Sequence, residues 1–108
     1  MKTSNVNFTI ELDENHVPEQ MSWEATDAQE RSPCKAAMIS VWDSQNNDTL
    51  RMDLWTKDML VDHMKQFYHQ TLLAMADSIE KSINEKNMAD DLRDYCQHFA
   101  EKLDLLAE

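Results

Sequence analysis

The sequence contains no glycine in 108 residues. Phosphate-binding loops of the GxGxxG or GxxxxGK[ST] type need glycine where the backbone approaches a phosphate, so both kinds of site are excluded. Only two prolines are present, Pro18 and Pro33. Turns must therefore be built largely on asparagine and aspartate, whose short side chains tolerate turn geometry.

Basic residues are also scarce. The chain has 10 Lys and Arg against 21 Asp and Glu, which gives a formal net charge of −11. The acidic excess is distributed evenly along the chain: residues 1–56 include 4 basic and 10 acidic residues, and residues 57–108 include 6 basic and 11 acidic residues. Nucleic-acid binding needs clustered Lys and Arg, and an anionic membrane repels such a surface. We therefore expect protein partners and no nucleic acid.

No apolar run reaches the length of a signal peptide or of a membrane span. We therefore expect neither export by a signal peptide nor direct membrane insertion. The two cysteines, Cys34 and Cys96, lie far apart and form no CxxC pair. This usage predicts free thiols in a reducing cytoplasm, with a single disulfide between them as the alternative.

The first half of the chain alternates apolar and polar residues with a period of two, which is typical of strands with one wet face. Leu50, Met52 and Leu54 are expected to face the core, whereas Trp55 shares its parity with Arg51 and Asp53. The polar segment 27–33 is predicted to be a connection. The predicted strands cover about residues 5–12, 20–26, 35–43 and 49–55, and the third is expected to be the most buried.

The second half changes to steps of three and four, which predicts two amphipathic helices over about residues 57–84 and 88–106. Thr56 and Asn87 are the expected N-caps. The polar segment 84–87, which reads NEKN, is short enough to favour an antiparallel helix pair. The chain is therefore predicted to be one α+β domain over 1–108, a four-stranded antiparallel sheet followed by two long helices packed on one face (ββββαα).

Two tryptophans are candidate contact residues for a protein partner. By its parity Trp55 is expected on the sheet face away from the core, and Trp23 is the second candidate, since aromatic residues are enriched at binding hot spots. The alternative is that Trp42 and Trp55, which end two successive strands, pack at the rim of the sheet.

No residue set points to catalysis, to a cofactor or to a metal. His63 and His69 lie six positions apart, so they do not form the i, i+4 pair of a helical zinc site, and the HExxH motif is absent. Cys96 and His98 are neighbours that point apart on a helix, so they are not expected to act as a nucleophile and its base. We therefore do not expect an enzyme.

Three stretches, VWDSQNNDTLRMDLWTKDM, MKQFYHQTLLAMADS and RDYCQHFAEKL, resemble the gliding motility-associated protein GldC family of Bacteroidetes. The opening FTIELDENHVPEQMSWEATD is similar too, so the resemblance covers nearly the whole chain. DLWTKDM and FYHQTLLAMAD are its specific parts. The resemblance implies a small soluble protein accessory to gliding, without known enzymatic activity, and it supplies no catalytic residues.

Two functions follow as hypotheses. The first is a non-enzymatic accessory or adaptor protein of the bacterial gliding motility machinery that acts through protein–protein contacts. The alternative is a small acidic chaperone for export clients, similar to SecB in the order of strands and helices only. Because an open sheet has two edges that invite pairing, a homodimer is a further expectation.

The cysteine usage gives a first test. If both thiols are free, Cys34 and Cys96 should both react with a thiol reagent after denaturation without reductant, giving two labels per chain by mass spectrometry. A chain that takes up label only after reduction would contain a disulfide instead.

Overall fold

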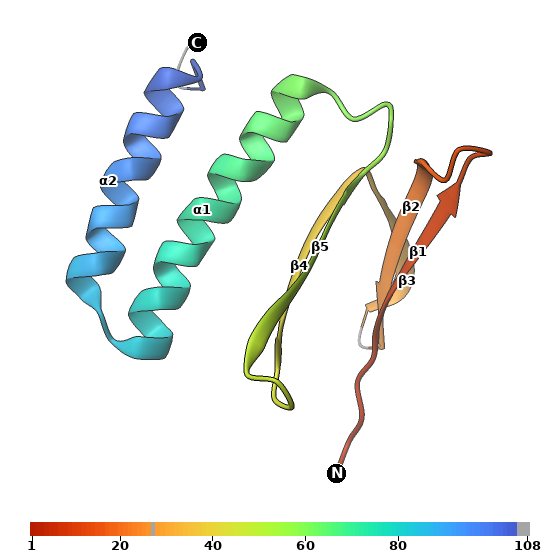
Figure 1. Ribbon diagram of the computed structural model, residues 1–108, viewed down its shortest axis with the longest axis horizontal. Coiled ribbons are helices and arrows are strands. Elements are labelled where there is room, and N and C mark those ends of the chain that lie inside the picture. Colours follow the sequence, from red (N-terminus) through yellow and green to blue (C-terminus); the bar gives the residue numbers. More distant parts are fainter. Residues whose placement is uncertain (27, 106–108) are drawn as a thin grey trace. The chain divides into compact units, whose positions relative to one another are not determined.

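The computed structural model describes residues 1–26 and 28–105 (Figure 1). Contacts divide the chain into two compact units: Met1–Met59 holds the strands and Leu60–Glu108 holds the helices. Within the described residues, five strands precede two helices, which confirms the predicted α+β class. The single domain over 1–108 stays a prediction, as does the packing of the helices on a sheet.

Three strands form the first sheet, in the order β1 (Val6–Leu12), β2 (Pro18–Ala25) and β3 (Ala28–Cys34), all antiparallel. Phe8 of β1 lies opposite Trp23 of β2, and Ile10 lies opposite Met21. Directly opposite residues share a face of a sheet, so the period-two alternation gathers these apolar side chains on one side. Met21 is the most buried of them.

The turn between β1 and β2 is organised by Asp13. Its carboxylate accepts hydrogen bonds from the backbone N–H groups of Asn15 at 2.8 Å and Val17 at 3.0 Å. His16 takes the left-handed conformation, with φ 62°. An aspartate-centred turn thus replaces the glycine turn that this chain cannot make.

The predicted polar connection over 27–33 is wrong from Ala28 onward, because β3 pairs with β2 there. Ser32 lies opposite Trp23, and Cys34 lies opposite Met21. Because an edge strand has an unpaired side in contact with water, it tolerates polar residues and a proline such as Pro33. Asp27 lies outside the described residues.

The second sheet is a separate two-stranded hairpin of β4 (Ala36–Asp43) and β5 (Asp48–Trp55). These strands occupy the predicted segments 35–43 and 49–55, but the single four-stranded sheet is wrong: the strands divide three and two. The break falls at Lys35, between β3 and β4. At the hairpin tip, Asn47 adopts φ 53°, as expected for a turn without glycine.

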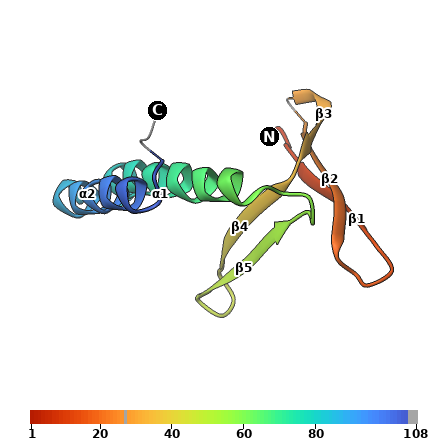
Figure 2. The same ribbon diagram turned by 90° about the horizontal axis from the view of Figure 1, so that it is seen from above.

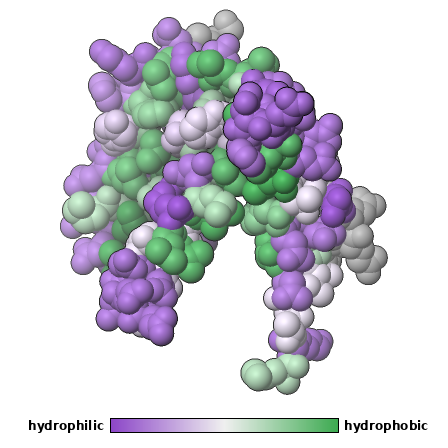
Figure 3. All heavy atoms as spheres, turned by 45° about the vertical axis from the view of Figure 1, so that its right-hand side comes forward, coloured by the Kyte–Doolittle hydropathy of each residue, from purple (hydrophilic) through white to green (hydrophobic). Residues whose placement is uncertain are grey.

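The face of this hairpin that was expected to be core is largely exposed. Leu50 and Met52 are 56% and 53% exposed, and Leu54 is half-buried. β4 is not a buried strand throughout either, because Ala37 is buried but Val41 is exposed. A two-stranded sheet covers little surface by itself, and Figure 3 shows apolar side chains at the surface of the molecule.

Two helices form the second unit, α1 (Val61–Ile83) and α2 (Lys86–Lys102), and they lie side by side in both ribbon views (Figures 1 and 2). α1 begins later than the predicted residue 57, and α2 begins two residues before the predicted 88. Asn84 ends α1 in the left-handed conformation, with φ 56°. α2 ends at Lys102 and residues 103–105 form a turn, so the predicted end of this helix at residue 106 is wrong.

Small side chains line the seam between the helices. Arg93 of α2 bonds Asp77 and Glu80 of α1, which orients that face of α2 toward α1. The ring of His69 on α1 stacks with that of Phe99 on α2 at 6.2 Å between centroids. The residues of these two faces that are at most 1% exposed are Ala76, Ala89, Cys96 and Ala100. Small residues allow the two helices to approach closely, whereas the larger residues Tyr68 and Tyr95 are exposed.

Because Ala76 is fully buried at the seam, Ala76→Leu should destabilise the chain by about 1–3 kcal/mol through overpacking. The measurement is the midpoint of urea unfolding followed by helical circular dichroism. Ala74→Leu adds the same atoms at an exposed position of α1 and should leave the midpoint close to that of the wild type. Equal midpoints for the two variants would contradict the close packing of Ala76 between the helices.

Candidate functional site

One face of the β4–β5 hairpin carries two exposed tryptophans. Trp55 lies opposite Ala36, Arg51 opposite Ser40, and Trp42 opposite Thr49. The register therefore places Trp42, Arg51 and Trp55 on the same side, which we call the tryptophan face. Trp42 is 62% exposed and Trp55 is 51% exposed. The predicted parity of Trp55 with Arg51 and Asp53, away from Leu50, Met52 and Leu54, agrees with this register.

The guanidinium of Arg51 is held in place on this face. One nitrogen, Nη1, donates to Ser40 Oγ at 2.6 Å, and Nη2 donates to Asp53 Oδ1 at 2.7 Å. Both partners belong to the same hairpin, so the guanidinium is fixed along the sheet between the two indoles. A side chain that is already ordered loses less conformational entropy on binding.

The other candidate, Trp23, lies on a different sheet. It faces Phe8 across β1 and β2 and is 37% exposed. Among residues 1–26 and 28–105, no ring contact joins Trp23 to Trp55; the ring contacts found involve His69, Tyr95, His98 and Phe99. The two predicted contact residues are therefore not gathered into one patch by direct contact.

The segment that follows β5 ties the two sheets together, and we call Thr56–Asp58 the clip. The N–H of Thr56 donates to the carbonyl of Lys35 at 2.8 Å, and the N–H of Lys57 donates to that of Pro18 at 3.2 Å. Thr56 is buried, and its hydroxyl donates to Asp58 at 2.7 Å. Asp58 in turn pairs with Lys35 at 3.1 Å.

Lys57 adds an ion pair to the clip. Its Nζ lies 2.9 Å from the Asp13 carboxylate and 3.6 Å from that of Glu19. The hydrogen bond from Lys57, together with those from the Val17 and Asn15 N–H groups, lowers the pKa of Asp13 to about 2. Bonding to Asp13 raises the pKa of Lys57, and the Thr56 hydroxyl followed by Lys35 lowers that of Asp58. These interactions therefore stabilise the charged forms of Asp13, Lys57 and Asp58.

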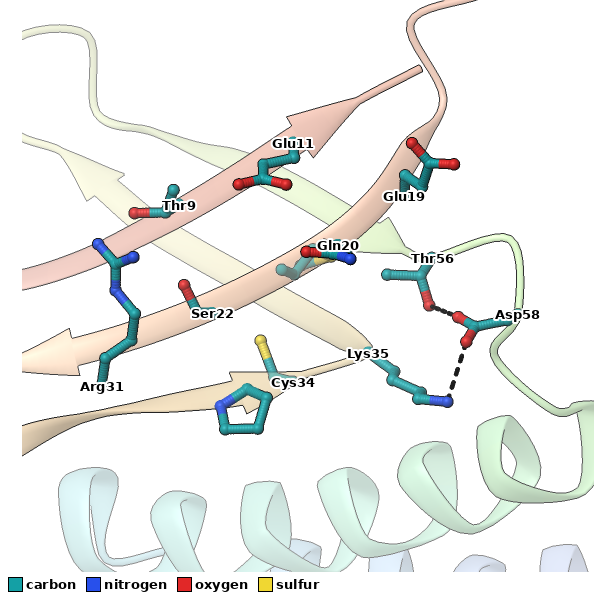
Figure 4. A pocket seen from close by; sticks show the side chains of 12 residues that line it. Thr9, Glu11, Glu19, Gln20, Ser22, Arg31, Cys34, Lys35, Thr56 and Asp58 are labelled. Atoms are coloured by element: carbon teal, nitrogen blue, oxygen red, sulfur yellow. Dashed lines mark hydrogen bonds and ion pairs between the residues drawn. The ribbon is translucent and has the colours of Figure 1, made fainter.

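A cavity of about 390 Å³ lies beside the clip (Figure 4). Its lining comes from β1, β2, β3, Lys35 and the clip, with Arg31 and Lys35 set among the carboxylates of Glu11, Glu19 and Asp58. Burial raises the pKa of the Cys34 thiol at its wall, so this thiol stays protonated and is a poor nucleophile. The mixed charges favour no single class of ligand. Sequence reasoning missed this cavity because its lining depends on β3.

In the described part of the chain, no group of three or more His, Cys, Asp and Glu side chains could hold a metal ion. Neither α1 nor α2 is long and apolar enough to cross a membrane. Both cysteines are free, which agrees with the predicted thiols.

A family model described as "Gliding motility-associated protein GldC-like" matches residues 18–105 of the chain. The chain belongs to this family. The matched region runs from the start of β2 to the end of the described residues and includes the tryptophan face and the clip, but not β1. The resemblance of residues 8–17 therefore stays a prediction. Neither a curated protein nor a solved structure shows a significant match to the chain.

The depressed pKa of Asp13 predicts an acid-sensitive clip. A carboxylate with a lowered folded-state pKa stabilises the fold above its ordinary value, 3.8, and this contribution is lost as the pH falls toward about 2. The wild type should therefore lose stability in urea more steeply between about pH 4 and pH 2 than Asp13→Asn, which cannot form the ion pair. Glu14→Gln removes the same charge from the next residue and should keep the wild-type slope. Identical slopes for wild type and Asp13→Asn would contradict this role of the clip.

Proposed function

We propose that the chain is a non-enzymatic accessory or adaptor protein of the bacterial gliding motility machinery and acts through protein–protein contacts. The family description supports the process, and the tryptophan face supports the mode of action. The proposed location is the cytoplasm, and the two free cysteines are consistent with it.

The observation that carries the proposal is the pair of exposed indoles around an ordered arginine. Tryptophan and arginine are the residue types most enriched at binding hot spots, where they fill pockets on the partner. Trp42 and Trp55 lie at opposite ends of the hairpin face, with Arg51 between them. This arrangement supports a partner surface that crosses both strands and has a recess for at least one indole.

The alternative is an acidic chaperone, and a different surface favours it. On the opposite face of the hairpin, the exposed residues Val41, Leu50 and Met52 form an apolar strip. The strip ends at the tip of the hairpin, where Asp43 lies opposite Asp48. An apolar surface bordered by carboxylates suits unfolded segments that carry both apolar and basic residues.

The two functions use opposite faces of one hairpin, so paired variants separate them. Trp55→Ala removes an indole from the tryptophan face, and Leu50→Ala shortens a similarly exposed side chain on the other face. Each variant and the wild type would be used as bait in lysates of a gliding bacterium. Circular dichroism would establish that all three baits fold equally.

An adaptor should capture a defined partner with the wild type and Leu50→Ala but not with Trp55→Ala. With that partner purified, Trp55→Ala should weaken binding by about thirty-fold or more, as expected for a hot-spot tryptophan worth about 2 kcal/mol. A chaperone should instead retain many unfolded chains and lose them with Leu50→Ala. Capture that is the same for all three baits would count against both surfaces.

A further inference from the structure

β1 has an open edge in the described chain. Its only backbone ladder is with β2. The Thr26 N–H donates to the carbonyl of Asn5 at 2.9 Å, and the Asn5 N–H donates to the Thr26 hydroxyl at 2.7 Å. Alternate residues of an antiparallel strand direct their N–H and C=O groups to the same side. Asn7, Thr9 and Glu11 therefore bond toward β2, and the backbone groups of Val6, Phe8 and Ile10 point to the open side.

The other strand edges are less suited to pairing. β3 contains Pro33, which has no N–H to donate. β4 and β5 form a two-stranded ribbon, in which twist is greater than in wider sheets and turns the edges away from a straight partner. β5 also carries three charged residues, Asp48, Arg51 and Asp53, whereas β1 has one, Glu11. Charged side chains are a common means of blocking an edge.

We propose that β1 is the contact between two copies of this chain, paired antiparallel about a two-fold axis through Thr9. This register pairs all seven residues of β1, because Thr9 is its central residue. The backbone N–H and C=O groups of Phe8 and Ile10, which point to the open side, then make these residues a hydrogen-bonded pair across the axis. Val6 lies opposite Leu12. Two three-stranded sheets become one six-stranded sheet. This contact goes beyond the proposed adaptor function and does not depend on it.

The sequence of β1 is complementary to itself in this register. On the polar face, Thr9 meets Thr9, a favourable cross-strand pair, and Asn7 meets Glu11, so an amide can donate to the carboxylate. No carboxylate on β1 lies directly opposite another, although each copy has a net charge of −11. This self-complementarity favours a second copy over an unrelated strand.

The apolar face gains a continuous row across the axis. In each copy Phe8 lies beside Trp23 and Ile10 lies beside Met21. Pairing Phe8 of one copy with Ile10 of the other aligns Trp23, Phe8, Ile10 and Met21 across four strands. Trp23 would therefore stabilise the contact between copies, which separates its role from that of Trp55.

Cysteine cross-linking tests the register. At the Thr9 pair, which is not hydrogen-bonded, the Cα atoms would be about 4.5 Å apart, within the roughly 4.4–6.8 Å range of disulfides. Thr9→Cys, made with Cys34→Ser to remove the other accessible thiol, should form a covalent dimer under mild oxidation. Asn7→Cys in the same background is the control, because its two copies would lie about 14 Å apart along the strands and should not cross-link.

Sedimentation at tens of micromolar in moderate salt accompanies the cross-linking. Wild type and reduced Thr9→Cys should both have twice the mass of one chain, which also shows that the variant assembles normally. A wild type that stays at the mass of one chain over the whole concentration range would overturn the proposal. So would a dimer in which Thr9→Cys fails to cross-link, or cross-links no better than Asn7→Cys, because the contact would then use another surface or register.

Discussion

The architecture of the first unit depends on two backbone hydrogen bonds, from the N–H groups of Thr56 and Lys57 to the carbonyls of Lys35 and Pro18. Lys35 is the break between β3 and β4, and Pro18 begins β2, so the end of β5 is bonded to both sheets at once. The Lys57–Asp13 ion pair extends the attachment to the β1–β2 turn. These bonds attach the β4–β5 hairpin to the first sheet, in addition to its covalent links at Lys35 and beyond Trp55. The tryptophan face is one side of this attached hairpin.

The clip also explains why the first helix begins where it does. Sequence reasoning assigned Thr56 as an N-cap because a threonine before an amphipathic stripe usually has that role. In the structure, Thr56 is buried and bonded to Lys35 and Asp58, and α1 begins only at Val61. Lys57 and Asp58, which follow Thr56, bond to Pro18 and Lys35, and the local sequence does not reveal these contacts. The end of α1 was predicted at about residue 84 and lies at Ile83, because asparagine at the next position readily takes the left-handed conformation that ends a helix.

In the rest of the fold and the site, features that depend on local sequence could likewise be predicted, whereas features that depend on contacts between distant segments could not. β1, β2, β4 and β5 follow from alternation, and so does the side on which Trp55 lies, because parity depends on one strand alone. β3 could not be predicted, since its polar sequence is permitted only by its edge position. The division into two sheets and the cavity beside β3 depend on that strand and were missed with it. The helix stripes were predicted, but their small-residue seam was not: a period alone does not show whether Tyr68 or Ala76 faces the neighbouring helix.

The absence of glycine has a thermodynamic consequence that reaches beyond the folded state. Among the residues that the structure describes, four non-glycine residues adopt positive φ: His16, Asn47, Asn84 and Asp104. Each such turn carries some steric cost in the native backbone, least for asparagine and aspartate. Every residue of the unfolded chain, however, is more restricted than glycine would be, so fewer conformations are lost on folding. The chain thus accepts slightly strained turns together with a less disordered unfolded ensemble, and the two contributions to the free energy of unfolding have opposite signs.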